Sequence, residues 1–121
     1  MAVITFTSDF GYTDHYAAAV KAAMLSLQPQ AQIVDISHGI EPFNIPQAEY
    51  VIGSVFREFP EGTVHLIAVD THGCKQGKYH AAKYKGHYFL LADNGLLSLL
   101  TEGQAEIVVE LQTDEDILPF P

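Results

Sequence analysis

The sequence predicts an α/β protein: a three-layer α/β/α sandwich with a mainly parallel sheet. Short apolar segments typical of strands alternate with amphipathic segments typical of helices, in the order strand, helix, strand, helix, strand over the first 70 residues. The first and third strand-like segments are each followed by an aspartate, Asp9 and Asp70. In proteins with this order, right-handed helical crossovers join parallel strands and cover both faces of the sheet.

The first strand is expected at Ala2–Ser8, which is rich in β-branched and aromatic residues and is followed by a turn at Asp9–Gly11. A helix should run from Thr13 to near Pro29, with Thr13 or Asp14 as its cap. Its apolar residues recur every three or four positions, at Ala17, Val20, Met24 and Leu27.

The second and third strands are expected at Gln32–Ile36 and Thr63–Val69. The third is almost continuously apolar, as is typical of a central strand covered on both faces. Between them we expect a loop at Glu41–Pro46 and then a helix from Pro46 to Phe59, because proline is favoured at the first helical position.

The second half of the chain predicts a β-hairpin, a short helix and a last strand. Lys78–Lys85 and Tyr88–Leu91 form the hairpin around a tight turn at Lys85–His87, the helix covers Asn94–Leu100, and the strand is Ile107–Leu111. Residues 1–111 should therefore form one α/β domain, and the acidic, proline-rich tail at 112–121 should mark a domain boundary.

The composition argues against several classes of partner. Six Lys and Arg against 15 Asp and Glu give a formal net charge of −9, which would repel both nucleic acid and an anionic membrane surface. No signal peptide follows Met1, so we expect a cytoplasmic location. The single cysteine, Cys74, cannot form an internal disulfide, and we expect no metal site.

Polar residues collect where the predicted strands end. In open α/β sheets, ligands bind in the crevice beyond the carboxyl ends of the strands, so these residues should lie along one edge and form the site. They are Asp9, Ser37, His38, Asp70, Asp93 and Asn94.

Each of these motifs also has a structural interpretation. Asp9 could accept hydrogen bonds from the two hydroxyls of a ribose, or could bind only backbone amides of its own turn. Asp14 and Asn94 could equally be helix caps. In the segment 69–80, Asp70, His72 and Cys74 could hold a metal, or Cys74 could act as a nucleophile, but the spacing matches no known metal signature and no oxyanion partner is identifiable.

Three segments taken together resemble the S-adenosylmethionine hydrolases (S-adenosylmethionine hydroxide adenosyltransferases) and the related fluorinases and chlorinases. They are ITFTSDFGYTDHYAAAVKAAM at 4–24, IVDISHGIEPFNIPQAEYVIGSVFREFPEGTVHLIAVD at 33–70 and HYFLLADNGLLS at 87–98. The resemblance covers about the whole chain. It implies the N-terminal domain of such an enzyme, whose C-terminal β domain is absent from this chain, and a trimeric assembly.

The resemblance also implies a reaction and a set of site residues. Water attacks C5′ of the ribose of S-adenosylmethionine, which is the substrate, and no cofactor is needed; the products are adenosine and methionine. By this likeness Asp9 would hold the ribose hydroxyls, Asp14 would lie near the methionyl end and Phe43 would lie against the substrate. Asp70 would orient the water, and Asn94 would be a loop residue beside the site.

The chain departs from the family where water is activated. The hydrolases carry an arginine seven residues after the aspartate and a histidine in a downstream His-Gly-Arg-Asp segment, whereas here Gly77 stands at the first position and the second segment does not occur before Pro121. His72 and Lys78 are candidate substitutes, which with Asp70 make the candidate catalytic residues.

Two functions therefore remain open. The first is a hydrolase domain, preferred over a halogenase because a carboxylate at position 70 would repel a halide. The alternative is a non-catalytic module that binds adenosine or S-adenosylmethionine, or a degenerate interaction module.

Overall fold

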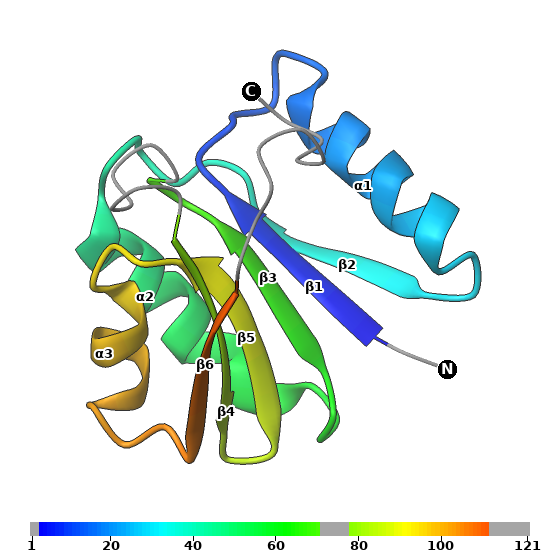
Figure 1. The fold of residues 1–121 in the computed structure, drawn as a ribbon. Helices are drawn as coiled ribbons and strands as arrows, with labels where there is room; N and C mark the ends of the chain where they lie inside the picture. The colour runs from blue at the N-terminus through cyan, green and yellow to red at the C-terminus, as the bar shows by residue number, and fades with distance from the viewer. Residues whose placement is uncertain (1–2, 71–77, 112–121) are drawn as a thin grey trace.

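The computed structural model describes residues 3–70 and 78–111, which form one six-stranded sheet with helices on both faces (Figure 1). The strands are β1 (Val3–Ser8), β2 (Gln32–Ser37), β3 (Val64–Ala68), β4 (Tyr79–Tyr84), β5 (His87–Ala92) and β6 (Ile107–Leu111). The helices are α1 (Tyr16–Leu27), α2 (Ile45–Val55) and α3 (Leu96–Thr101), with a 3-10 turn, η1 (Phe56–Glu58), directly after α2. The predicted element order is confirmed.

The sheet has the strand order β2-β1-β3-β5-β4-β6. β1 runs parallel to β2 and β3, and β3 runs parallel to β5, whereas β4 is antiparallel to both β5 and β6. The mainly parallel sheet is therefore confirmed. Because β2, β1, β3 and β5 point the same way, their carboxyl ends meet at one edge.

The two faces of the sheet are covered by different helices, which confirms the three layers (Figure 1). On one face α1 packs over a small core that includes Phe6, Val20 and Ala68. On the other face α2 and α3 cover the larger core, which includes Ile52, Phe56, Phe89 and Leu96. Among the described helices none covers the α1 face of β6, where Ile107 and Val109 are 57% and 50% exposed.

The hairpin between β4 and β5 has the tight turn that the sequence predicts. Lys85 and Gly86 have φ angles of 51° and 80°. Two successive residues with positive φ define a type I′ turn, whose twist matches that of the flanking strands. The hairpin places the antiparallel β4 beyond β5 and so leaves the parallel half of the sheet uninterrupted.

The helix boundaries differ from the predicted ones by one to four residues. α1 begins at Tyr16, three residues beyond the predicted start, and its N-cap residue is His15 and not Thr13 or Asp14, although Asp14 Oδ1 accepts a hydrogen bond from the Tyr16 amide at 3.1 Å. α2 ends early because Phe59 precedes a proline and adopts an extended backbone. α3 begins at Leu96 because Gly95 has a φ of 89° and cannot be part of the helix. In the part of the chain that the structure describes, no helix is long and apolar enough to cross a membrane.

Candidate active site

The connections of the sheet define a switch point between β1 and β3. From β1 the chain passes through α1 to β2 on one side, and from β2 it passes through α2 on the other face to β3, which lies on the opposite side of β1. Two helices therefore leave this point in opposite directions, and in open α/β sheets such a point, beyond the carboxyl ends of the strands, is the usual ligand site. Asp9 and Asp70 stand at the ends of these two strands.

Asp9 and Asp70 are in direct contact across this switch point. The backbone amide of Asp70 donates a hydrogen bond to Asp9 Oδ2 at 3.0 Å, and the amide of Asp9 donates to the Ala68 carbonyl at 3.3 Å. The structural interpretation of Asp9 is thus partly correct, but the amide it binds belongs to the neighbouring strand's loop and not to its own turn.

Asp70 has two unusual features. Its φ is 52°, in the left-handed region that costs a residue with a Cβ roughly 1 kcal/mol. Its Oδ1 is buried and has no hydrogen-bond partner among the described residues. Buried polar atoms are nearly always paired, so a partner for this oxygen is expected outside the described residues, as it is for Thr7 Oγ1.

Asn94 supports the Asp70 backbone from the neighbouring strand. Its side-chain amide donates to the Val69 carbonyl at 2.7 Å and lies 3.4 Å from the Asp70 carbonyl, while its Oδ1 accepts from the Leu96 amide at 3.1 Å. The side chain therefore both binds the first amide of α3, whose N-cap residue is Gly95, and ties the end of β5 to the end of β3. Direct substrate binding by Asn94 stays a prediction.

His38, directly after β2, makes a second network beside this pair. Its Nδ1 lies 2.6 Å from Ser8 Oγ and its Nε2 lies 2.8 Å from Asp35 Oδ1, and the other oxygen of Asp35 accepts from Lys21 Nζ at 2.8 Å. Partial burial raises the pKa of Asp35, but the hydrogen bonds from Lys21 and His38 outweigh it and hold that pKa below the ordinary value. Asp35 is therefore an ionised acceptor at neutral pH.

The sequence placed His38 at this edge but gave no role to Ser8, Asp35 or Tyr12. Asp35 is the sole charged residue in the otherwise strand-like segment Gln32–Ser37, which was the available signal. Two partners of His38, Ser8 and Tyr12, could not be read from the sequence because they lie 30 and 26 residues away, in β1 and the loop after it.

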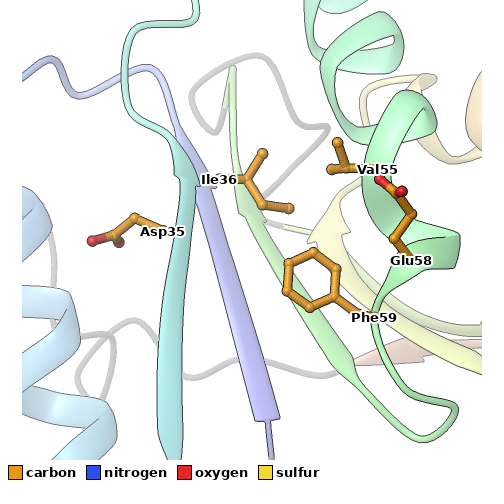
Figure 2. A pocket seen from close by; sticks show the side chains of 5 residues that line it. All are labelled: Asp35, Ile36, Val55, Glu58 and Phe59. Atoms are coloured by element: carbon orange, nitrogen blue, oxygen red, sulfur yellow. The ribbon is translucent and has the colours of Figure 1, made fainter.

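A cavity of about 320 Å³ lies between β2 and the end of α2, on the side of β2 that faces away from the His38 network. Figure 2 shows Ile36, Val55 and Phe59 turned toward it, and the Asp35 side chain on the other side of β2. The cavity is mainly apolar and is separate from the polar networks at the carboxyl edge. The charged end of Asp35 thus belongs to the His38 network and not to this cavity.

The remaining predicted site residues lie elsewhere or outside the described part. Asp14 is exposed and binds the first amide of α1, and Phe43 is 67% exposed with a φ of 64° in the loop between β2 and α2. Lys78 Nζ lies 3.6 Å from Glu110 Oε1 of β6. His72, Cys74 and Gly77 lie outside the described residues, and within 3–70 and 78–111 no group of three or more His, Cys, Asp or Glu could hold a metal.

Comparison with protein families gives one match over most of the chain. Residues 4–119 match the family model described as the S-adenosylmethionine hydroxide adenosyltransferase N-terminal domain. The chain is 35% identical over 105 residues to an (R)-S-adenosyl-L-methionine hydrolase of Methanocaldococcus jannaschii, covering 83% of this chain and 40% of that protein. It is 44% identical over 140 aligned positions to a fluorinase of Nocardia brasiliensis, covering 97% of this chain and 47% of that protein.

The fold is also found in solved structures. An uncharacterised conserved protein from Thermotoga maritima superposes with a TM-score of 0.83 at 34% identity, over 90% of this chain and 42% of that one. The chain spans less than half the length of the curated relatives reported above. Both the motif-based resemblance and the α/β fold class are thereby confirmed, and the chain belongs to the S-adenosylmethionine hydroxide adenosyltransferase family, in which it corresponds to the N-terminal domain.

Proposed function

We propose that this chain is the nucleoside-binding part of an enzyme that transfers the 5′-adenosyl group of S-adenosylmethionine to water. The observation that supports this most directly is the contact of Asp9 and Asp70 at the switch point, with Asp70 Oδ1 buried and unpaired among the described residues. A pair of carboxylates at such a switch point suits a ribose and a polarised water. It does not suit a phosphate, which both charges would repel.

In the proposed reaction the water oxygen forms a bond to C5′ while the C5′–S bond breaks. The electron pair of that bond stays on sulfur, so methionine leaves as a neutral thioether and no general acid is required. The water loses one proton, which Asp70 Oδ1 accepts or passes to solvent. The site's contribution is to orient the water and to align it with the C5′–S bond.

The other residues take roles around this centre. Asp9 holds the ribose hydroxyls, Asp14 meets the ammonium group of the methionyl end, and Phe43 lies against the substrate. Asn94 supports the backbone of Asp70 from the end of β5. His72 and Lys78 are the candidates for a positive partner of Asp70 in place of the missing arginine at Gly77.

Water is preferred over halide as the nucleophile. The negative charge of Asp70 would repel a halide ion at the same position. Relatives of both kinds, hydrolases and a fluorinase, match this chain, so the preference rests on the charge of Asp70.

We also propose a location, an oligomeric state and a set of partners for the whole protein. The whole protein would act in the cytoplasm as a trimer, without a cofactor, and without nucleic acid or membrane as a partner. The acidic net charge of −9 supports the last point. Light scattering on the purified protein measures the oligomeric state, and a monomer at high concentration would contradict the trimer.

A binding module without catalysis is the second candidate. The observation that favours it is Gly77, which stands where the hydrolases have an arginine. Such a module would bind adenosine or S-adenosylmethionine through Asp9 without turnover.

The test is incubation of the chain with S-adenosylmethionine in ¹⁸O-labelled water. Hydrolysis at C5′ produces methionine and an adenosine heavier by the isotope difference, whereas any other route leaves the adenosine unlabelled. Asp70→Asn should lower the rate at least about 100-fold while retaining adenosine binding, and Asp9→Ala should abolish binding in calorimetry. Glu49→Gln, on α2, removes one carboxylate away from the site and is the matched control.

The outcomes separate the candidates. Labelled adenosine with methionine supports the hydrolase, and binding of adenosine without turnover supports the module. If the wild-type chain neither binds adenosine nor releases methionine, both proposals for this chain are wrong.

A further inference from the structure

We propose that His38 is a positioning residue of the nucleoside site: it holds the loop that contains Asp9 in place through hydrogen bonds to Ser8, Gly11 and Tyr12, and Asp35 fixes its ring. This inference rests on the proposed function for its consequence, ligand binding, but its structural part can be tested without a ligand.

All four polar atoms of His38 have partners, and three of these partners belong to β1 or the loop after it. The carbonyl oxygen of His38 accepts from the Gly11 amide at 2.8 Å, its amide donates to Tyr12 Oη at 2.9 Å, and Nδ1 lies 2.6 Å from Ser8 Oγ. The fourth atom, Nε2, lies 2.8 Å from Asp35. His38 therefore links the end of β2 to both sides of Asp9.

The His38 ring is also held in place by the aromatic rings that pack against it. It is 3% exposed, and the Phe6 ring meets it edge-on with a centroid distance of 4.8 Å. The Tyr12 ring lies 5.9 Å away, also edge-on, so the residue that binds the His38 amide also covers its side chain. Neither the ring nor the loop can move without breaking several contacts.

The direction of each hydrogen bond follows from Asp35. An ionised carboxylate can only accept, so His38 Nε2 carries a proton, and in the neutral imidazole Nδ1 then presents a lone pair to Ser8. The Ser8 hydroxyl then donates to Nδ1, and its oxygen accepts from the Phe10 amide at 3.3 Å. Asp9 lies between two residues, Ser8 and Phe10, that this chain of bonds fixes.

The loop needs this support because its backbone is otherwise free to move. Gly11 has a φ of 81° and no side chain to restrict it, and Tyr12, Thr13 and Asp14 are exposed. Asp9 must meet the Asp70 amide with one oxygen and ribose hydroxyls with its remaining acceptor positions. A displacement of about 1 Å in such a site is enough to cost a large part of the binding or rate.

Two matched variants distinguish the contact of Nδ1 with Ser8 from the contact of Nε2 with Asp35. In His38→Asn the side-chain oxygen can replace Nδ1 as acceptor for Ser8, while the contact with Asp35 is lost. In His38→Gln the side-chain amide can replace Nε2 as donor to Asp35, while the acceptor for Ser8 is lost. We expect His38→Gln to weaken adenosine binding about tenfold or more, and His38→Asn to change it less than about threefold.

A third variant avoids changes in the interior. Tyr12 is 71% exposed, so Tyr12→Phe removes the hydroxyl that binds the His38 amide without opening a cavity. It should weaken adenosine binding by a few-fold. The matched control is Tyr50→Phe, because Tyr50 is 73% exposed on α2 and is remote from this loop.

The ligand-free readout is amide hydrogen exchange measured by NMR. The Phe10 and Gly11 amides should be protected in the wild type and in His38→Asn, and should exchange at least about tenfold faster in His38→Gln. Nitrogen shifts of the His38 ring should show protonation at Nε2 and not at Nδ1. These measurements decide the structural claim even if adenosine does not bind, and in that case the proposed function fails while the loop restraint stands.

Several results would overturn the inference. One is unchanged protection of Phe10 and Gly11 in His38→Gln together with unchanged affinity in Tyr12→Phe. Another is an equal loss in His38→Asn and His38→Gln, because the ring would then serve only to fill space. If His38→Gln does not fold, the comparison of Tyr12→Phe with Tyr50→Phe decides the question by itself.

Discussion

Two buried histidines lie on opposite faces of β1, and each is bonded to a hydroxyl of that strand. His38 is bonded to Ser8 on the α1 face, and His65 of β3 is bonded to Thr5 at 2.7 Å on the face of α2. Ser8 and Thr5 are three residues apart, an odd number, so their side chains point to opposite faces of the sheet. The two networks differ in what the second ring nitrogen meets.

For His38 the second partner is a carboxylate, whereas for His65 it is another imidazole. His65 Nε2 lies 3.1 Å from His87 Nδ1, and the rings of Phe56 and Phe89 surround the pair. Burial first and the neighbouring His87 second lower the pKa of His65 from 6.5 to about 4. Burial also lowers the pKa of His87, which Glu61 opposes and Arg57 reinforces.

The comparison shows that burial alone does not assign a role to a histidine. A carboxylate partner fixes the orientation of the His38 ring and ties it to the loop of the candidate site. A neutral imidazole pair in an aromatic core instead stabilises the fold, and only as long as both rings stay uncharged. The three predictions below test this difference.

The largest effect should be a loss of folding stability in acid that is caused by the lowered pKa of His65. Since its pKa is lowered in the folded state, the unfolded chain binds a proton between pH 6.5 and about 4 that the folded chain does not, and the free energy of unfolding falls as the pH falls through this window. The full shift corresponds to about 3 kcal/mol, and on the order of 2 kcal/mol of it is lost by pH 4.5, which is still above the lowered pKa. Above pH 6.5 no such loss occurs.

Urea unfolding at pH 7 and pH 4.5 measures this loss. His65→Phe removes the titrating ring and should flatten the pH dependence, while His15→Gln, at an exposed histidine before α1, should leave it unchanged. An equally steep pH dependence in His65→Phe would show that other groups cause the acid sensitivity.

The next effect concerns the two hydroxyls of β1. Thr5→Val keeps the shape of the side chain but leaves His65 Nδ1 without its partner, which should cost about 1 to 2 kcal/mol of stability and leave adenosine affinity unchanged. Ser8→Ala should lower stability less than Thr5→Val does, but it should weaken adenosine binding. Denaturant titration and calorimetry on both variants make the comparison, and an equal pattern in the two would remove the distinction between the networks.

The smallest effect should come from the outer end of the His38 network. Lys21 and Asp35 form an ion pair at 2.8 Å with side chains 34% and 40% exposed. Pairs of this kind contribute about 0.5 kcal/mol, so Lys21→Ala should lower stability by that amount and less so at 1 M salt. A loss above about 2 kcal/mol, measured by urea unfolding, would mean that Lys21 is essential to the orientation of Asp35 and His38.

The sequence predicted the framework of the molecule because that framework depends on local patterns. The alternation of strands and helices, the hairpin at Lys85–Gly86 and the strand Ile107–Leu111 all follow from residue periodicity and turn chemistry. Asp9 and Asp70 were found for a similar reason, since strand ends in a parallel sheet meet at one edge.

The two histidine networks depend on distant segments and could not be predicted in the same way. Thr5 and His65 are register partners across β1 and β3, 60 residues apart in the chain, and His65 stands within a strand that is otherwise apolar. The three contacts of His38 with β1 and its loop depend on how two loops fold back on each other. Side-chain direction across separate segments is not encoded in any local pattern.

The left-handed backbone at Asp70 has a consequence for how this position can change over generations. A φ of 52° is easiest for glycine or asparagine, so random substitution under selection for folding alone would favour those residues here. An aspartate tolerates this backbone less well than glycine and also leaves a buried oxygen without a partner in the described chain. Under the proposed function Asp70 is therefore a position where stability and activity oppose each other, and a lineage that no longer needs the proposed reaction should lose Asp70 early.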